Sequence, residues 1–128
     1  MRIVVIVACS LTRYSLHEAA LTFVRAALLA RHEIAGVYLL QDGVELALAR
    51  GDQTEPGARL LADWSQLAGT SQQSTPPCLG VCVGALGRRQ SPGAEVASEP
   101  AVSGFEPMGL GQIIAALLTA DRVVEFRA

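Results

Sequence analysis

A cysteine at the end of an apolar run is the side chain in this sequence with the most evident chemistry. The segment CLGVCVGALGRR, residues 78–89, places Cys82 just before a glycine-containing turn and the pair Arg88 and Arg89. A thiol attacks as its thiolate, which nearby positive charge and the start of a helix stabilise. Cys82 is therefore a candidate nucleophile, and since a nucleophile needs access we expect it to be only partly buried. The alternative is a buried, unreactive thiol. The two arginines either support the thiolate or form a solvated helix end.

Two other uses of the cysteines are less favoured. Cys78 lies four residues before Cys82, and in an extended strand that spacing separates the Cα atoms by about 13 Å. A disulfide needs less than about 7 Å, so only a helical segment would permit a redox pair. Zinc needs about four ligands, and the chain offers only Cys9, His17 and His32 in addition. We therefore expect no metal centre.

The remaining side chains exclude several kinds of catalysis. We expect His17 on the surface in the first turn of a helix and His32 at the end of that helix, where a cation is favourable. No histidine lies close to a cysteine in sequence, as a thiol that cleaves peptide bonds would require. A thiol that only carries sulfur has no such need. The chain contains no lysine, which excludes Schiff-base chemistry and a P-loop.

The composition indicates a small intracellular protein with partners. Of its 128 residues 51% are apolar and 17% are charged, against about 25% charged in average proteins. We expect part of the apolar excess to lie at a subunit interface. A net charge of −2 argues against direct binding of nucleic acid. The three cysteines favour a reducing, cytoplasmic location. No apolar stretch approaches the roughly 20 residues of a membrane span.

The apolar patterns predict strands that alternate with helices. The continuous β-branched run at 2–8 is typical of a strand buried on both faces. Ser15 and Glu18 form a capping-box pattern at the start of a helix that ends near His32. Its predicted apolar face consists of Leu16, Ala19, Ala20, Phe23, Ala27 and Ala30. The further predicted elements are strands at 34–40, 78–83 and 121–126, helices at 44–50, 58–68 and 110–120, a turn or short helix at 84–89, and a mobile flap at 90–104.

This order predicts an α/β fold: a single domain over residues 1–128, built as a three-layer sandwich with a mainly parallel sheet of four or five strands. In such folds the chemistry gathers at the carboxyl ends of the strands. Cys9–Ser10, Asp42–Gly43 and Cys82 are expected to meet there. The turn CSLTRYS, residues 9–15, contains no glycine, so a dinucleotide site is not expected.

Three segments resemble the small DsrE/TusD-type sulfurtransferases. The stretch VCVGALGRR at 81–89 is similar to the active-cysteine segment of that family. The stretches RHEIAGVYLLQDGVELA at 31–47 and GFEPMGLGQIIAALLTADRVVEF at 104–126 resemble two further family segments in the same order. The likeness therefore spans nearly the whole chain. It departs from the family in a shorter segment at 90–104 and in Gly84 and Gly87, where alanines are commoner.

The resemblance implies a sulfurtransferase subunit in which Cys82 accepts sulfur as a persulfide. Val83, Gly84, Arg88 and Arg89 would support the thiol. It also implies two related small subunits in a heterohexamer, an upstream sulfur-donor protein, a downstream acceptor protein, and neither a metal nor an organic cofactor. We expect the pathway to be 2-thiolation of tRNA wobble uridine, with intracellular sulfur oxidation as the alternative. A non-catalytic scaffold subunit of the same fold is the other alternative.

Overall fold

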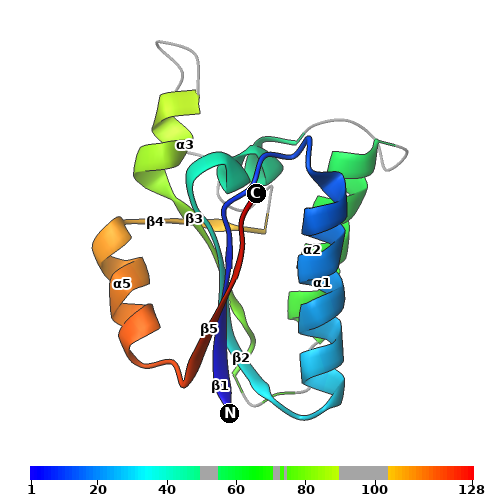
Figure 1. The fold of residues 1–128 in the computed structure, drawn as a ribbon, viewed down its shortest axis with the longest axis vertical. Coiled ribbons are helices and arrows are strands. Elements are labelled where there is room, and N and C mark those ends of the chain that lie inside the picture. The colour runs from blue at the N-terminus through cyan, green and yellow to red at the C-terminus, as the bar shows by residue number, and fades with distance from the viewer. Residues whose placement is uncertain (50–54, 71–72, 74, 90–103) are drawn as a thin grey trace.

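The computed structural model describes residues 1–49, 55–70, 73, 75–89 and 104–128, and within them a five-stranded, entirely parallel sheet (Figure 1). The strand order is β4-β3-β2-β1-β5. The strands are β1 Arg2–Val7, β2 Glu33–Leu39, β3 Cys78–Cys82, β4 Glu106–Met108 and β5 Arg122–Phe126. The other elements are α1 Tyr14–Leu29, the 3₁₀ helix η1 Gln41–Leu48, α2 Pro56–Thr70, α3 Val83–Arg89 and α5 Leu110–Leu118. The predicted α/β class and parallel sheet are confirmed.

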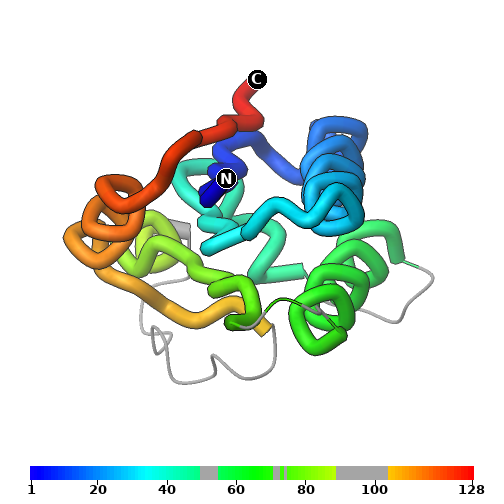
Figure 2. The backbone as a smooth tube through the Cα atoms, turned by 90° about the horizontal axis from the view of Figure 1, so that it is seen from below, coloured from blue at the N-terminus to red at the C-terminus, as the bar shows by residue number. Residues whose placement is uncertain are grey.

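Helices lie on both sides of the sheet. Figure 2 shows α1 and α2 on one side and α5 on the other. On the α1 side, the rings of Phe23 and Phe126 are 6.0 Å apart, and Trp64 of α2 meets Phe105 edge-on at 6.4 Å. β1 occupies the interior of the sheet between β2 and β5, and its residues from Ile3 to Val7 are all buried. This confirms the prediction of a first strand covered on both faces.

The side that carries α5 keeps an exposed apolar surface. Leu110, Ile114 and Leu118 follow one another at intervals of four residues, so they form one stripe along the helix. All three are exposed, Leu118 to 82%, and Val123 of β5 is exposed as well. We call these four residues the α5 face.

The first helix differs from its prediction. α1 begins at Tyr14 with Arg13 as the N-cap residue and no side-chain capping bond, so the predicted Ser15–Glu18 capping box is wrong. The Arg13 amide instead donates to the Ser10 carbonyl, which closes a turn before the helix. The apolar face is rotated as a result: Ala19 and Ala30 of the predicted face are exposed. The buried residues of α1 are His17, Ala20, Leu21, Val24 and Ala27.

The other elements follow the predictions with shifted ends and one addition. β2, β3, β5, α2 and α5 lie where the apolar patterns place them, and the turn at 84–89 is the helix α3. The short helix begins at Gln41, three residues before its predicted start. β4 was not predicted. The proposed mobile flap at 90–104 falls, except for Gly104, outside the described residues. No helix among the described residues is both long and apolar enough to span a membrane.

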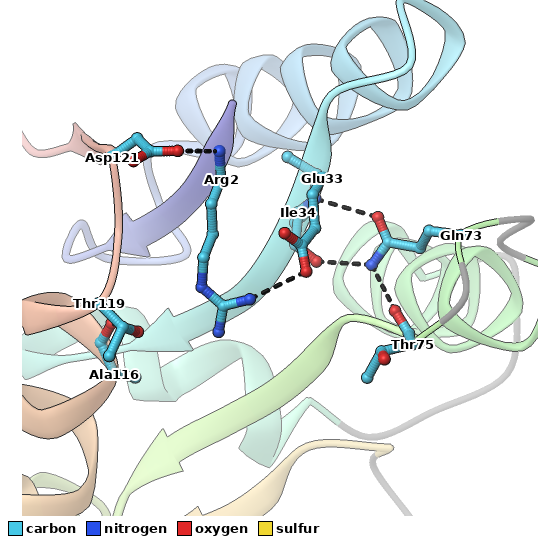
Figure 3. Close-up of polar contacts among 8 residues, drawn as sticks. All are labelled: Arg2, Glu33, Ile34, Gln73, Thr75, Ala116, Thr119 and Asp121. Atoms are coloured by element: carbon cyan, nitrogen blue, oxygen red, sulfur yellow. Dashed lines mark hydrogen bonds and ion pairs between the residues drawn. The ribbon is translucent and has the colours of Figure 1, made fainter.

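Side chains complete the pairing at the amino edge of the sheet (Figure 3). The Gln73 amide accepts a hydrogen bond from the Ile34 backbone N–H at 3.0 Å and donates one to the Ile34 carbonyl at 2.7 Å. This side chain therefore imitates a neighbouring strand at a level of β2 that β3 does not reach. The Arg2 guanidinium pairs with Glu33 at 2.9 Å, and the Arg2 backbone N–H donates to Asp121 at 2.7 Å.

A close backbone approach at the carboxyl edge requires a glycine. The Leu40 amide donates to the Val7 carbonyl at 3.0 Å, which draws the start of η1 onto the end of β1. A Cβ atom at Gly43 would collide with that carbonyl oxygen and lie 2.8 Å from its carbon. Only a residue without a side chain fits there unless the backbone moves.

We predict that Gly43→Ala lowers the free energy of unfolding by about 1–3 kcal/mol, the usual cost of overpacking. The matched control is Gly69→Ala in α2, where a Cβ would meet nothing within 4 Å. This control should be neutral or stabilising, because alanine favours helix over glycine. Urea denaturation of both variants measures the difference. Equal urea midpoints for Gly43→Ala and Gly69→Ala would contradict the close approach of Gly43 to the Val7 carbonyl.

Candidate active site

Cys82 is the last residue of β3, and α3 begins at the next residue. The thiol therefore stands at the carboxyl edge of the sheet, as predicted. α3 packs against η1, and Ala85 and Leu86 in its first turns are buried. Cys82 itself is only 9% exposed, so the expectation that it would be partly exposed is wrong. The helix α3 follows this strand without an intervening loop.

The predicted supporting residues are distributed around the first turns of α3. Val83 is half-buried, while Gly84 and Arg88 are exposed. A Cβ at Gly84 would lie 3.7 Å from Arg88 Nη1, so this guanidinium folds back over the start of the helix. The Arg89 backbone belongs to α3, but its side chain lies outside the described part of the chain. Support of the thiolate by the arginines stays a prediction.

Glu45 organises the neighbouring strand end. Its Oε1 accepts hydrogen bonds from Ser10 Oγ at 2.8 Å and from the Leu11 backbone N–H at 2.9 Å. The carboxylate thereby ties the loop after β1 to η1 and fixes Ser10 at the carboxyl edge. Asp42 lies in the first turn of η1. Sequence reasoning placed Ser10 and Asp42 at this edge but missed Glu45, which no local motif distinguishes.

The two histidines, His17 and His32, lie at opposite ends of α1. His17 is buried rather than on the surface, because it lies on the face of α1 that packs against the core. The N-cap of this helix is Arg13, two residues before the predicted Ser15. Its Nε2 lies 2.9 Å from the Cys9 carbonyl oxygen. A carbonyl only accepts, so His17 Nε2 carries the proton and donates. His32 lies beyond the end of α1, where its predicted charge effect stays untested.

The other two thiols are embedded in the core region. Cys9 is buried, and burial raises the pKa of its thiol. Cys78 is half-buried, and burial raises the pKa of its thiol too, although a hydrogen bond from Tyr38 opposes the rise. The Cys78 Sγ atom lies 3.8 Å from Met108 Sδ. Burial raises the pKa of Tyr38 to about 12, so its hydroxyl keeps its proton near neutral pH.

Cys78 and Cys82 both lie within the five residues of β3, and all three cysteines are free thiols. An extended strand holds these two thiols too far apart for a disulfide. Cys78 and Cys82 therefore lie in an extended strand, the arrangement in which we expected no disulfide between them. Among the described residues, no three side chains of His, Cys, Asp or Glu gather in a way that would hold a metal ion.

Tyr38 and Met108 are site residues that sequence reasoning missed. The signal for Tyr38 was present: Gly36 and Gly80 lie inside predicted strands, where glycine marks a close approach by another group. A Cβ at Gly36 would lie 2.5 Å from the Tyr38 hydroxyl, and one at Gly80 would lie 2.7 Å from its ring. Met108 belongs to β4, whose three residues are too few to show a periodic pattern.

We predict that Tyr38→Phe makes Cys78 less reactive near neutral pH. The variant removes a hydrogen bond that lowers the pKa of the Cys78 thiol and leaves burial, which raises it, unopposed. The pH profile of Cys78 alkylation by iodoacetamide, followed by peptide mapping, should move to higher pH. The alkylation profile of Cys9 in the same samples is the control. A Cys78 profile that stays in place or moves down would contradict the hydrogen bond.

Comparison with known proteins places these features in a family. The model of the DsrE/DsrF-like family matches residues 1–126. Sulfurtransferase TusD of Sodalis glossinidius is 35% identical over 119 residues, with 85% of each chain covered. Sulfurtransferase TusD of Pectobacterium carotovorum is 31% identical over 115 residues, covering 85% of this chain and 86% of that protein.

A solved structure agrees on the fold. The crystal structure of the ychN protein from E. coli superposes with a TM-score of 0.64 and covers 98% of this chain and 100% of that one. Its sequence is 17% identical, so it bears on the architecture alone.

Proposed function

The chain belongs to the DsrE/DsrF-like family, and from this premise we propose that it is a persulfide-carrying sulfurtransferase subunit with Cys82 as the carrier. Its similarity to proteins named Sulfurtransferase TusD supports sulfur transfer as the activity. The observation that carries the proposal is the position of Cys82, between the carboxyl end of β3 and the first residue of α3. Chemistry in parallel α/β folds gathers at that edge.

The proposed reaction is an exchange of one sulfur atom between thiols. The Cys82 thiolate attacks the outer sulfur of a persulfide on the donor protein. A new S–S bond forms on Cys82 while the S–S bond of the donor breaks, and the donor thiolate leaves with the electron pair. An acceptor thiolate then attacks the outer sulfur on Cys82, and the Cys82 thiolate leaves. Each step is a thiol exchange that requires no external oxidant.

The surroundings of Cys82 suit a carrier. A persulfide must not meet stray thiols or oxidants before the acceptor arrives, and Cys82 is 9% exposed. His17 donates from Nε2 to a backbone carbonyl, so that nitrogen is not free to take a proton. Sulfur carriage needs no such base, whereas peptide hydrolysis does. Val83, Gly84, Arg88 and Arg89 are the proposed supporting residues for the anionic sulfur.

The subunit acts within a cytoplasmic sulfur relay, between a donor protein and an acceptor protein. We assign the relay to 2-thiolation of the wobble uridine of tRNA, with intracellular sulfur oxidation as the alternative. The net charge of the chain is −2, with 10 basic and 12 acidic side chains. Nucleic acid is therefore the target of the pathway and not a ligand of this chain.

Two related small subunits complete the assembly, which we propose is a heterohexamer. The α5 face supports this part of the proposal, because Leu110, Ile114, Leu118 and Val123 expose apolar side chains on one side of the sheet. A subunit that worked alone would leave this surface in water.

The burial of Cys82 favours one rival role, a scaffold subunit of the same fold whose cysteine is inert.

We predict that the wild-type chain, incubated with a persulfide-loaded cysteine desulfurase, gains the mass of one sulfur atom and loses it again on reduction. Cys82→Ser should abolish the gain, because the serine hydroxyl cannot form the S–S bond. Cys78→Ser should load like the wild type, since burial raises the pKa of the Cys78 thiol. Intact mass spectrometry measures all three proteins. A wild type that takes up no sulfur, even with its partner subunits present, would establish the scaffold role.

We predict that Leu118→Glu weakens assembly without unfolding the subunit. The side chain is 82% exposed, so a carboxylate there costs little in the isolated chain but is desolvated in an apolar interface. Ala26→Glu is the matched control, because Ala26 is exposed on α1, on the opposite side of the sheet. Native mass spectrometry of co-expressed subunits should show fewer complexes for Leu118→Glu only. Equal assembly of both variants would exclude the α5 face as an interface.

A further inference from the structure

β4 places a methionine directly beside the carrier cysteine. The register of β3 and β4 pairs Cys82 with Met108. Successive side chains alternate between the faces of a sheet, and paired residues on neighbouring parallel strands point to the same face. Met108 and Cys82 therefore share a face, the one that carries α5, with Gly80 and Cys78 further along β3.

The position of the Met108 side chain is defined by its sulfur, which lies near two residues of β3. Its sulfur lies over Gly80, where a Cβ atom would collide with it. The same sulfur is 3.8 Å from Cys78 Sγ. The Tyr38 ring also lies over Gly80, so ring and thioether together fill the space that the glycine leaves. The methionine thus extends from the level of Cys82 back toward Cys78 and occupies the surface between the two thiols.

We infer that Met108 is a positioning residue for the sulfur carried on Cys82: its side chain forms the wall beside the persulfide and limits the approach of other thiols. The inference rests on the proposed persulfide chemistry of Cys82. The outer sulfur of a persulfide lies about 2.05 Å from Sγ. On this face of β3 the neighbouring position, Gly80, has no side chain, and the Met108 sulfur lies over it. Thioethers are polarisable and adaptable, which suits contact with a sulfur that comes and goes.

The reaction that Met108 limits is the loss of sulfur to a free thiol. A glutathione thiolate attacks the outer sulfur on Cys82, glutathione persulfide forms, and the Cys82 thiolate leaves. Shortening residue 108 opens one side of the persulfide and should accelerate this step. A leucine keeps most of the volume, so shielding survives without the thioether.

The test compares Met108→Ala and Met108→Leu with the wild type, and uses Leu29→Ala as a control on an exposed residue of α1, outside the α5 face. Each protein is loaded with sulfur and then mixed with excess glutathione, and intact mass follows the loss of sulfur. We expect Met108→Ala to lose sulfur several-fold faster, and Met108→Leu and Leu29→Ala to stay within about twofold of wild type. An unchanged rate in Met108→Ala would overturn the inference.

A second readout separates this inference from the proposed function. Iodoacetamide alkylation of the unloaded proteins, resolved by peptide mapping, reports access to each thiol without any sulfur loading. Met108→Ala should accelerate alkylation of Cys82 and leave the buried Cys9 unchanged. If the wild type does not load sulfur, the proposed function fails. Equal rates of Cys82 alkylation in Met108→Ala and wild type would overturn the inference that Met108 limits access to Cys82. Faster alkylation of Cys9 would show general loosening and would also overturn the inference.

If Met108→Ala does not fold, Met108→Val replaces it in both assays. Valine is shorter than methionine and suits a strand, so it opens the same side by a smaller amount. We expect the same direction of change in sulfur loss and in Cys82 alkylation, and no change in either would overturn the inference.

Discussion

The packing of one tyrosine on two glycines underlies the arrangement of this site. Tyr38 lies across Gly36 of its own strand and Gly80 of the neighbouring strand, in space that any larger residue would fill. Tyr38 and Gly80 are also paired in the β2–β3 register. A slip of β3 by one residue would turn every side chain of that strand to the other face and put a valine or a leucine against the ring. The tyrosine therefore fixes the register, and the register decides which residue ends β3.

From that register the position of Cys82 follows. β3 pairs with β2 from Cys78 to Val81, and the next residue, Cys82, pairs with Met108 of β4. At the same edge, the hydrogen bonds accepted by Glu45 and the missing side chain of Gly43 hold the loop after β1 against η1. α3 then packs on η1. The position of Cys82 thus depends on the pairing of β3 with β2 and β4 and on the packing of α3 against η1.

The sequence predicted those parts whose signal is local and repeated. Continuous apolar runs identified β1, β2 and β3, and the run that ends at Cys82 placed the thiol at the carboxyl edge. The parts that failed depend on distant contacts. β4 contains Pro107, which an edge strand tolerates, and only its pairing with β3 defines it. The burial of His17 depends on where α1 begins, which a turn at Ser10 decides. Partial exposure of Cys82 was expected from its chemistry, whereas its burial is a matter of packing.

The low exposure of Cys82 is compatible with transfer because the reacting atom changes between the two steps. In the empty state the nucleophile is Sγ of Cys82, a residue that is 9% exposed. In the loaded state the atom under attack is the outer sulfur, about 2 Å from Sγ. The Met108 side chain covers one side of that sulfur and so reduces the directions from which a freely diffusing thiol can attack it. The other sides stay open to the thiol of a bound acceptor protein, which docking directs to the sulfur. Loading the empty thiol is then the step that most requires a docked partner, and the sheet edge that buries Cys82 thereby favours protein donors over small thiols.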